Sequence, residues 1–160
     1  MGPNRSIDIN AYFVVCANVI GGCMGSYGPS NVDPNTNKIL GTNFPIITIN
    51  DMVNAQYNLL GFFKIDQLFC VAGGSMGGMQ VLQFVANFPD KAKIAIPIAC
   101  TASHSAQNIA FNELGRQAIA ADNNWNEGNY ISKETIPNKG LAVARMAAHI
   151  TYLSKKGLQE

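Results

Sequence analysis

Residues 71–80 read Val-Ala-Gly-Gly-Ser-Met-Gly-Gly-Met-Gln, and this stretch decides the fold of the chain. It contains the pattern Gly73-x-Ser75-x-Gly77, which is the nucleophile elbow of enzymes that attack their substrate with a serine. The elbow is a tight turn in which the serine holds a strained backbone, and glycine neighbours avoid the clashes that a Cβ atom would cause there. We therefore predict that Ser75 is a catalytic nucleophile.

The sequence around the elbow has the order that the motif requires. Residues 67–72 form an apolar, strand-like run, and residues 76–87 have the apolar spacing of a helix. A serine between such a strand and helix lies at the helix N-terminus, where free backbone N–H groups can stabilise an oxyanion. We predict that Met76 provides one of these N–H groups.

Strand-like and helical runs alternate on both sides of the elbow. A strand that is buried on both faces reads as a continuous apolar run, and helices of about 12 residues between such runs are typical crossover connections. The pattern is β-α-β-α-β, which predicts an α/β fold with central parallel strands and right-handed crossover helices. We expect strands at 12–20, 67–72 and 93–100 and helices at 49–62, with Thr48 as its cap, and at 76–87.

The remaining segments differ in character from this pattern. Residues 21–44 read as a long loop rich in glycine, proline, asparagine and serine. After residue 104 we expect a helix at 105–121, an irregular loop at 122–139 and a second helix at 140–155, with no further strand. We therefore divide the chain into the central part of the core, 1–104, and the beginning of a helical lid, 105–160.

Composition excludes several classes of function. The net charge is +1, with 48% hydrophobic and 13% charged residues, which favours one globular domain and gives no reason to expect a nucleic-acid partner. We see no membrane-spanning run, no signal peptide and no metal-binding spacing among the four cysteines. We expect a cytoplasmic protein without a metal site.

A serine nucleophile needs a base, and the base needs an orienting carboxylate. The chain has two histidines, His104 and His149. No aspartate lies near His104 in the sequence, and His149 shares a helical face with Arg145 and Tyr152. Since neither histidine is a convincing base, we expect the chain to be a central piece of a longer enzyme. On spacing alone, the face could be solvated or could present Arg145 and Tyr152 to a substrate.

Several segments resemble the homoserine O-acetyltransferase family of the α/β-hydrolase superfamily. The clearest are Phe44-Pro-Ile-Ile-Thr-Ile-Asn-Asp-Met-Val53 and Gly73-Gly-Ser-Met-Gly-Gly-Met-Gln80. The resemblance extends to residues 15–29, 105–119 and 140–154. It implies a partial α/β-hydrolase fold with a helical lid, and the transfer of an acetyl group from acetyl-CoA to the hydroxyl of L-homoserine in methionine synthesis.

The same resemblance implies roles for individual residues. Ser75 would form an acetyl-serine intermediate, and Arg145 and Tyr152 would hold the amino-acid substrate. Acetyl-CoA would be a co-substrate, with no bound cofactor, and the full-length enzyme could be a homodimer. The family's Asp and His would lie beyond Glu160, and its second oxyanion donor before Met1. We therefore expect the chain to be inactive alone.

Three alternatives stay open at this point. Relatives with the same elbow use succinyl-CoA or acylate serine and other alcohols. A serine esterase of the same fold would pass the acyl group to water. A third hypothesis is an inactive truncated copy that folds in part or serves only as an interaction module.

Overall fold

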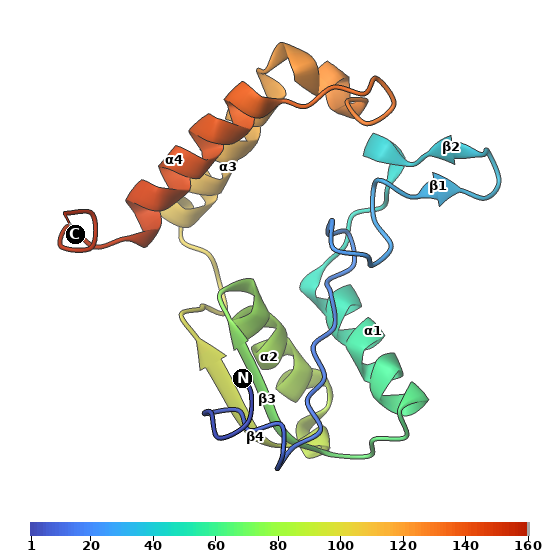
Figure 1. Ribbon diagram of the computed structural model, residues 1–160, viewed down its shortest axis with the longest axis vertical. Coiled ribbons are helices and arrows are strands. Elements are labelled where there is room, and N and C mark those ends of the chain that lie inside the picture. Colours follow the sequence, from blue (N-terminus) through green and yellow to red (C-terminus); the bar gives the residue numbers. More distant parts are fainter. Residues whose placement is uncertain (160) are drawn as a thin grey trace.

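The computed structural model describes residues 1–159 and has two parts (Figure 1). The core holds a pair of parallel strands with two helices, and a hairpin of two long helices stands beside it. The elements in chain order are β1 (Val32–Asp33), β2 (Lys38–Ile39), η1 (Gly41–Asn43), α1 (Ile49–Phe62), β3 (Leu68–Gly74), α2 (Met76–Asn87), η2 (Pro89–Lys91), β4 (Ala92–Ile98), α3 (Ala106–Ala120), η3 (Asn123–Gly128) and α4 (Asn138–Tyr152).

The central unit is a β-α-β crossover, as predicted. β3 pairs with β4 in parallel from Leu68↔Ala92 to Gly74↔Ile98, and α2 connects the two strands. The Ser75 N–H donates to the carbonyl of Ile98 at 2.9 Å, so the ladder continues into the elbow. Because alternate residues of a strand face opposite sides, Pro97 directs its backbone away from β3, where its missing N–H breaks no bond of this ladder.

The helices of the core meet in a small hydrophobic centre. Val53 and Leu60 of α1 and Phe84 of α2 are buried together, and Leu68 and Val71 of β3 pack against them. α1 begins at the predicted cap, because the Thr48 hydroxyl accepts from the Asp51 N–H at 3.2 Å and the Asp51 carboxylate accepts from the Thr48 N–H at 2.8 Å. The Thr48 hydroxyl also donates to the Asp51 carboxylate at 2.6 Å, and this bond, with the one from the Thr48 N–H, holds the pKa of Asp51 below its usual range.

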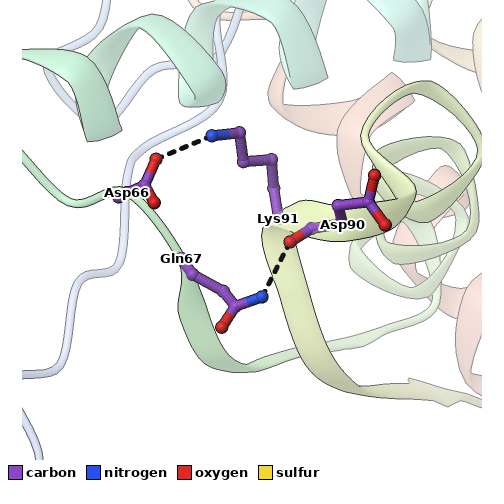
Figure 2. Close-up of polar contacts among 4 residues, drawn as sticks. All are labelled: Asp66, Gln67, Asp90 and Lys91. Atoms are coloured by element: carbon purple, nitrogen blue, oxygen red, sulfur yellow. Dashed lines mark hydrogen bonds and ion pairs between the residues drawn. The ribbon is translucent and has the colours of Figure 1, made fainter.

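Two polar contacts join the amino ends of β3 and β4, at the opposite end from the elbow (Figure 2). The Lys91 ammonium lies 2.8 Å from the Asp66 carboxylate, and the Gln67 amide donates to the Asp90 carbonyl at 2.8 Å. The ion pair lowers the pKa of Asp66, whose side chain is exposed. An exposed pair stabilises a fold only weakly, so these contacts set the strand ends rather than the stability of the core.

The prediction of a strand at residues 12–20 is wrong for this structure. Within residues 1–159, the segment pairs with neither β3 nor β4. Tyr12 instead stacks its ring on Phe69 of β3, with ring centroids 5.2 Å apart, and Phe13 is 76% exposed. An apolar run indicates a tendency to be buried, but a strand forms only where a neighbour presents N–H and C=O groups in register.

The segment expected as a loop at 21–44 contains β1 and β2, which pair antiparallel. The Asp33 carboxylate forms the turn between them, because it accepts from the Asn35 N–H at 2.9 Å and from the Thr36 hydroxyl at 3.1 Å. An aspartate turn of this kind can be recognised in the sequence, but strands of two residues are too short to show the alternation of apolar and polar residues that predicts a strand.

The second part of the chain contains both predicted helices, and the loop between them contains η3. Ser105 caps α3 by accepting from the Asn108 N–H at 3.2 Å. α4 ends at Tyr152 rather than at Lys155, since Leu153 turns to extended backbone. No helix in residues 1–159 combines the length and apolar character needed to cross a membrane.

Phe84→Ala tests the centre of the core. Phe84 is 2% exposed, and we expect its truncation to lower the free energy of unfolding by about 3–5 kcal/mol. Phe62→Ala is the matched control, because Phe62 is 79% exposed. Urea denaturation followed by circular dichroism measures both variants, and equal losses of stability would contradict this description of the core.

Candidate active site

The elbow places Ser75 in a strained backbone conformation. Its φ is 54° and its ψ is −121°, a region that residues with a Cβ rarely occupy. Both of its backbone polar groups are held: the N–H donates to Ile98, and the carbonyl accepts from the Met79 N–H at 3.1 Å. The strain persists because β4 and the first turn of α2 fix Ser75 from both sides.

The glycines of the motif have different functions. A Cβ on Gly73 would lie 2.3 Å from the carbonyl oxygen of Gly77, so strand and helix approach each other there to backbone contact. A Cβ on Gly78 would lie 2.6 Å from the sulfur of Cys100, a contact that the sequence analysis did not predict. At Gly74 and Gly77 a Cβ would meet nothing within 4 Å. Close approach therefore explains Gly73 and Gly78 but leaves Gly74 and Gly77 unexplained.

The first turn of α2 has the geometry of an anion-binding site. Met76 is the first residue of the helix, and within residues 1–159 its N–H has no acceptor. Free N–H groups and the positive end of the helix dipole together favour a developing negative charge. An oxyanion formed beside the exposed Ser75 could accept a hydrogen bond from Met76.

A buried amide pair lies behind this turn. Gln80 is 6% exposed and accepts from the Gln56 amide of α1 at 2.6 Å, while its own amide donates to the Met76 carbonyl at 3.4 Å. The pair links α1 to the turn that carries Met76. Sequence reasoning missed it, although glutamine on the apolar face of a predicted helix was the feature that could have found it.

Neither histidine is hydrogen-bonded to Ser75 within the described residues. His104 follows β4, is exposed, and lines a cavity of about 430 Å³ together with Met79 and Thr101. His149 is exposed on α4, with its Nδ1 3.3 Å from the carbonyl oxygen of Arg145. The geometry gives neither imidazole the contact that a general base makes with a serine hydroxyl.

Arg145 and Tyr152 lie on α4, with His149, as the spacing predicted. Both side chains are exposed, Tyr152 to 80%, and in residues 1–159 no carboxylate pairs with the Arg145 guanidinium. α4 packs against α3 rather than against the elbow (Figure 1). The structure thus brings Met76 to Ser75 but forms no hydrogen bond from Ser75 to Arg145 or Tyr152.

Metal ligands do not cluster in the part of the chain that the structure describes. No group of three His, Cys, Asp or Glu side chains there could hold a metal ion. All four cysteines are free thiols, of which Cys16 and Cys23 are exposed and Cys70 and Cys100 half-buried.

Alanine at Gly73 tests the contact between strand and helix at the elbow. We expect Gly73→Ala to destabilise the chain by roughly 2 kcal/mol or more, because the new methyl group collides with backbone that cannot move aside. Gly74→Ala is the control and should change stability by less than about 0.5 kcal/mol. Thermal unfolding measures the stability of both variants. A Gly73→Ala variant as stable as the wild type would show that strand and helix are not in backbone contact at the elbow.

Comparison with known proteins gives the fold and a set of relatives. The model of the alpha/beta hydrolase fold family matches residues 4–157. The chain is 74% identical over 160 residues to a homoserine O-acetyltransferase from Pelagibacter ubique (strain HTCC1062), a match that covers 100% of the chain and 43% of that protein. The chain thus spans less than half the length of this relative.

Two solved structures have the same arrangement of elements. A mutant of esterase E22 superposes with a TM-score of 0.88 at 32% identity, covering 97% of this chain and 43% of the esterase chain. A homoserine O-acetyltransferase from Bacillus anthracis superposes with a TM-score of 0.86 at 27% identity, covering 94% of this chain and 42% of the transferase chain. Shape alone therefore does not separate a transferase from an esterase.

Proposed function

The chain belongs to the alpha/beta hydrolase fold family, and on this basis we propose that it is the elbow-bearing part of a homoserine O-acetyltransferase. The supporting observation is the 74% identity to a homoserine O-acetyltransferase along its whole length. At that identity, a strained Ser75 beside a free helix N-terminus supports the same acyl-transfer chemistry. The proposed reaction moves an acetyl group from acetyl-CoA to the hydroxyl of L-homoserine, a step of methionine synthesis.

The proposed reaction has two steps. In the first, the Ser75 oxygen attacks the thioester carbonyl, a general base takes its proton, and the C–S bond breaks to release CoA as the thiol with that proton. In the second, the homoserine hydroxyl attacks the acetyl-serine, gives its proton to the base and frees Ser75, which recovers a proton. The Met76 N–H stabilises the oxyanion of both tetrahedral intermediates.

The base of this reaction is not supplied by the histidines of the chain. Neither His104 nor His149 is hydrogen-bonded to Ser75 in residues 1–159. We propose that the base, its carboxylate and the second oxyanion donor come from other segments of the enzyme, and that the 160-residue chain does not turn over alone. Acetyl-CoA acts as a co-substrate, and no resident cofactor takes part.

Arg145 and Tyr152 are the proposed acceptor-binding residues, in a lid that begins at residue 105. A guanidinium is a planar fork that binds a carboxylate through two parallel hydrogen bonds. Arg145 is exposed and has no carboxylate partner in residues 1–159, so its fork is available for the carboxylate of L-homoserine. Tyr152, about two turns further along α4, is the proposed second contact to the same ligand through its hydroxyl.

A second candidate is an esterase of the same fold. The similarity to esterase E22, with a TM-score of 0.88, supports it. The two functions share the acyl-enzyme and differ in whether water or an alcohol takes the acyl group. Acetate release in the absence of L-homoserine, as fast as acetyl transfer in its presence, would favour the esterase. The use of succinyl-CoA or of serine would be found by exchanging donor or acceptor in the same assay.

The function is tested by transplanting the chain. We expect residues 1–160, placed in the Pelagibacter ubique homoserine O-acetyltransferase in exchange for the matched 43% of that protein, to retain acetylation of L-homoserine. Ser75→Ala in this chimera should lower kcat by at least about 10³-fold. The isolated chain should consume no acetyl-CoA. A folded but inactive chimera would contradict the proposal, and Ser75-dependent turnover of the isolated chain would contradict the missing base.

Arg145→Lys in the chimera tests acceptor binding. Lysine keeps the charge but loses the fork, so we expect the KM for L-homoserine to rise about tenfold or more, with the KM for acetyl-CoA unchanged. Arg116→Lys is the matched control, because Arg116 pairs with Glu113 on the surface of α3. Equal effects of the two substitutions would remove the proposed role of Arg145.

A further inference from the structure

We propose that Asp122 is a positioning residue for the acceptor site, because its carboxylate holds the first turn of α4 and so sets where Arg145 stands. This proposal rests on the proposed function, which gives Arg145 its role. Asp122 lies between α3 and η3, at the start of the segment that the sequence predicts to be an irregular loop.

The first turn of α4 has no cap of its own. Its N-cap residue is Pro137, whose side chain accepts no hydrogen bond. The N–H of Gly140, in the first turn, donates instead to the Asp122 carboxylate at 2.9 Å, although the two residues are 18 positions apart. A carboxylate at a helix N-terminus also interacts favourably with the helix dipole.

The same carboxylate holds a second helix start. Its other oxygen accepts from the Asn124 N–H at 3.0 Å, in the first turn of η3. The bond from Gly140, and after it the bond from Asn124, lower the pKa of Asp122. The charge that acts on it is the Lys139 ammonium from α4, and in residues 1–159 neither α3 nor η3 contributes a comparable charge. Asp122 is therefore ionised at neutral pH and ties η3 to α4.

Because α4 packs closely on α3, the hydrogen bond from Gly140 to Asp122 affects the position of the whole helix. A Cβ on Gly140 would lie 2.3 Å from the carbonyl oxygen of Ala118 and 2.7 Å from the Cα of Ile119, so α4 meets α3 at backbone contact. At that separation α4 can slide or rotate along α3 but cannot move closer. The bond from Gly140 to Asp122 opposes this movement at the first turn of α4, while bonds from Asn124 to Ile136 and from Thr135 to Asn124 hold only the segment ahead of the helix.

A displacement at Gly140 reaches Arg145. Arg145 lies five residues further along a continuous helix, about 7.5 Å along its axis at 1.5 Å per residue. A helix transmits a rigid shift of its first turn to the following turns with little loss. Freeing the first turn of α4 therefore moves the guanidinium relative to the core.

Through η3, Asp122 is also connected to η1, which lies outside the helical hairpin. A Cβ on Gly128 would lie 2.2 Å from the side chain of Thr42 in η1, so η3 contacts η1 directly. Trp125 of η3 stacks on Tyr130, with ring centroids 5.3 Å apart. Asp122 thus connects α4 to a segment that is itself in contact with residues outside the helical hairpin. Trp125 is the chain's only tryptophan and reports on this region.

Hydrogen exchange in the 160-residue chain tests whether Asp122 holds α4. We expect Asp122→Ala to speed amide exchange in the first half of α4 by about three- to thirtyfold, as for the loss of a helix cap, and to increase quenching of Trp125 fluorescence by acrylamide. Asp122→Asn keeps one acceptor oxygen and should lie between the wild type and Asp122→Ala.

Ser105→Ala is the matched control, because it removes the cap of α3 in the same hairpin. It should speed exchange at the start of α3 and leave α4 and Trp125 unchanged. Unchanged exchange of α4 in Asp122→Ala, or the same pattern in both variants, would overturn the proposal.

Kinetics in the chimera test whether the tie positions Arg145. We expect Asp122→Ala to raise the KM for L-homoserine several-fold while kcat and the KM for acetyl-CoA change by less than about twofold. An unchanged KM for L-homoserine would overturn the positioning role and reduce Asp122 to a helix cap. A chimera with wild-type residues that folds but does not acetylate L-homoserine would instead contradict the proposed function, and hydrogen exchange would still decide whether Asp122 holds α4.

Discussion

The contact of Gly73 with the carbonyl of Gly77 is the constraint on which the core depends. It allows β3 to run into α2 without a loop, because a Cβ at Gly73 would collide with the Gly77 carbonyl oxygen at 2.3 Å. A chain that turns so sharply must place one residue at positive φ, and that residue is Ser75. The strain is stable because Ile98 and Met79 hold both polar groups of Ser75 from two different elements. The reactive hydroxyl and the free N–H of Met76 are therefore consequences of one backbone approach.

The chemistry of the proposed reaction is divided between two parts of the chain. Ser75 and Met76 belong to the core, whereas Arg145 and Tyr152 belong to a helical hairpin that packs mainly on itself. The hairpin is joined to the rest of the chain by the connection after β4, in which Ala99 has a φ of 48°, and it contacts η1 where Gly128 meets Thr42. The proposed acceptor site therefore depends on how the hairpin is held, which is the role that we propose for Asp122.

The features that could be predicted from the sequence are those that depend on near neighbours in the chain. Three such features are the elbow, the cap of α1 by Thr48 and the cap of α3 by Ser105. Each involves residues within four positions, so its pattern can be recognised in the amino-acid sequence. The strand expected at 12–20 failed for the opposite reason. Its apolar residues are real, but the partner backbone that would turn them into a strand is not encoded in the run itself.

The same distinction applies to the site. The contact between Gly78 and Cys100, the pair of Gln56 and Gln80, and the bond from Gly140 to Asp122 join residues 18 or more positions apart. No spacing rule links such residues, because their proximity is set by how helices pack. A glutamine on an apolar face, or a glycine within a helix, marks a position where such a contact is to be sought, but does not name the partner.

The division between core and hairpin also bears on whether the acyl group goes to water or to an alcohol. In the proposed mechanism the elbow needs only to form the acyl-enzyme, and that demand is the same for a transferase and an esterase. The chain accordingly superposes equally well on a mutant of esterase E22 and on a homoserine O-acetyltransferase, with TM-scores of 0.88 and 0.86. The choice between the two acceptors must then depend on groups that bind the acceptor alcohol tightly enough for it to outcompete water. Within this chain, the group that we propose for that task is the Arg145 guanidinium of α4, since an amino-acid acceptor carries a carboxylate and water does not.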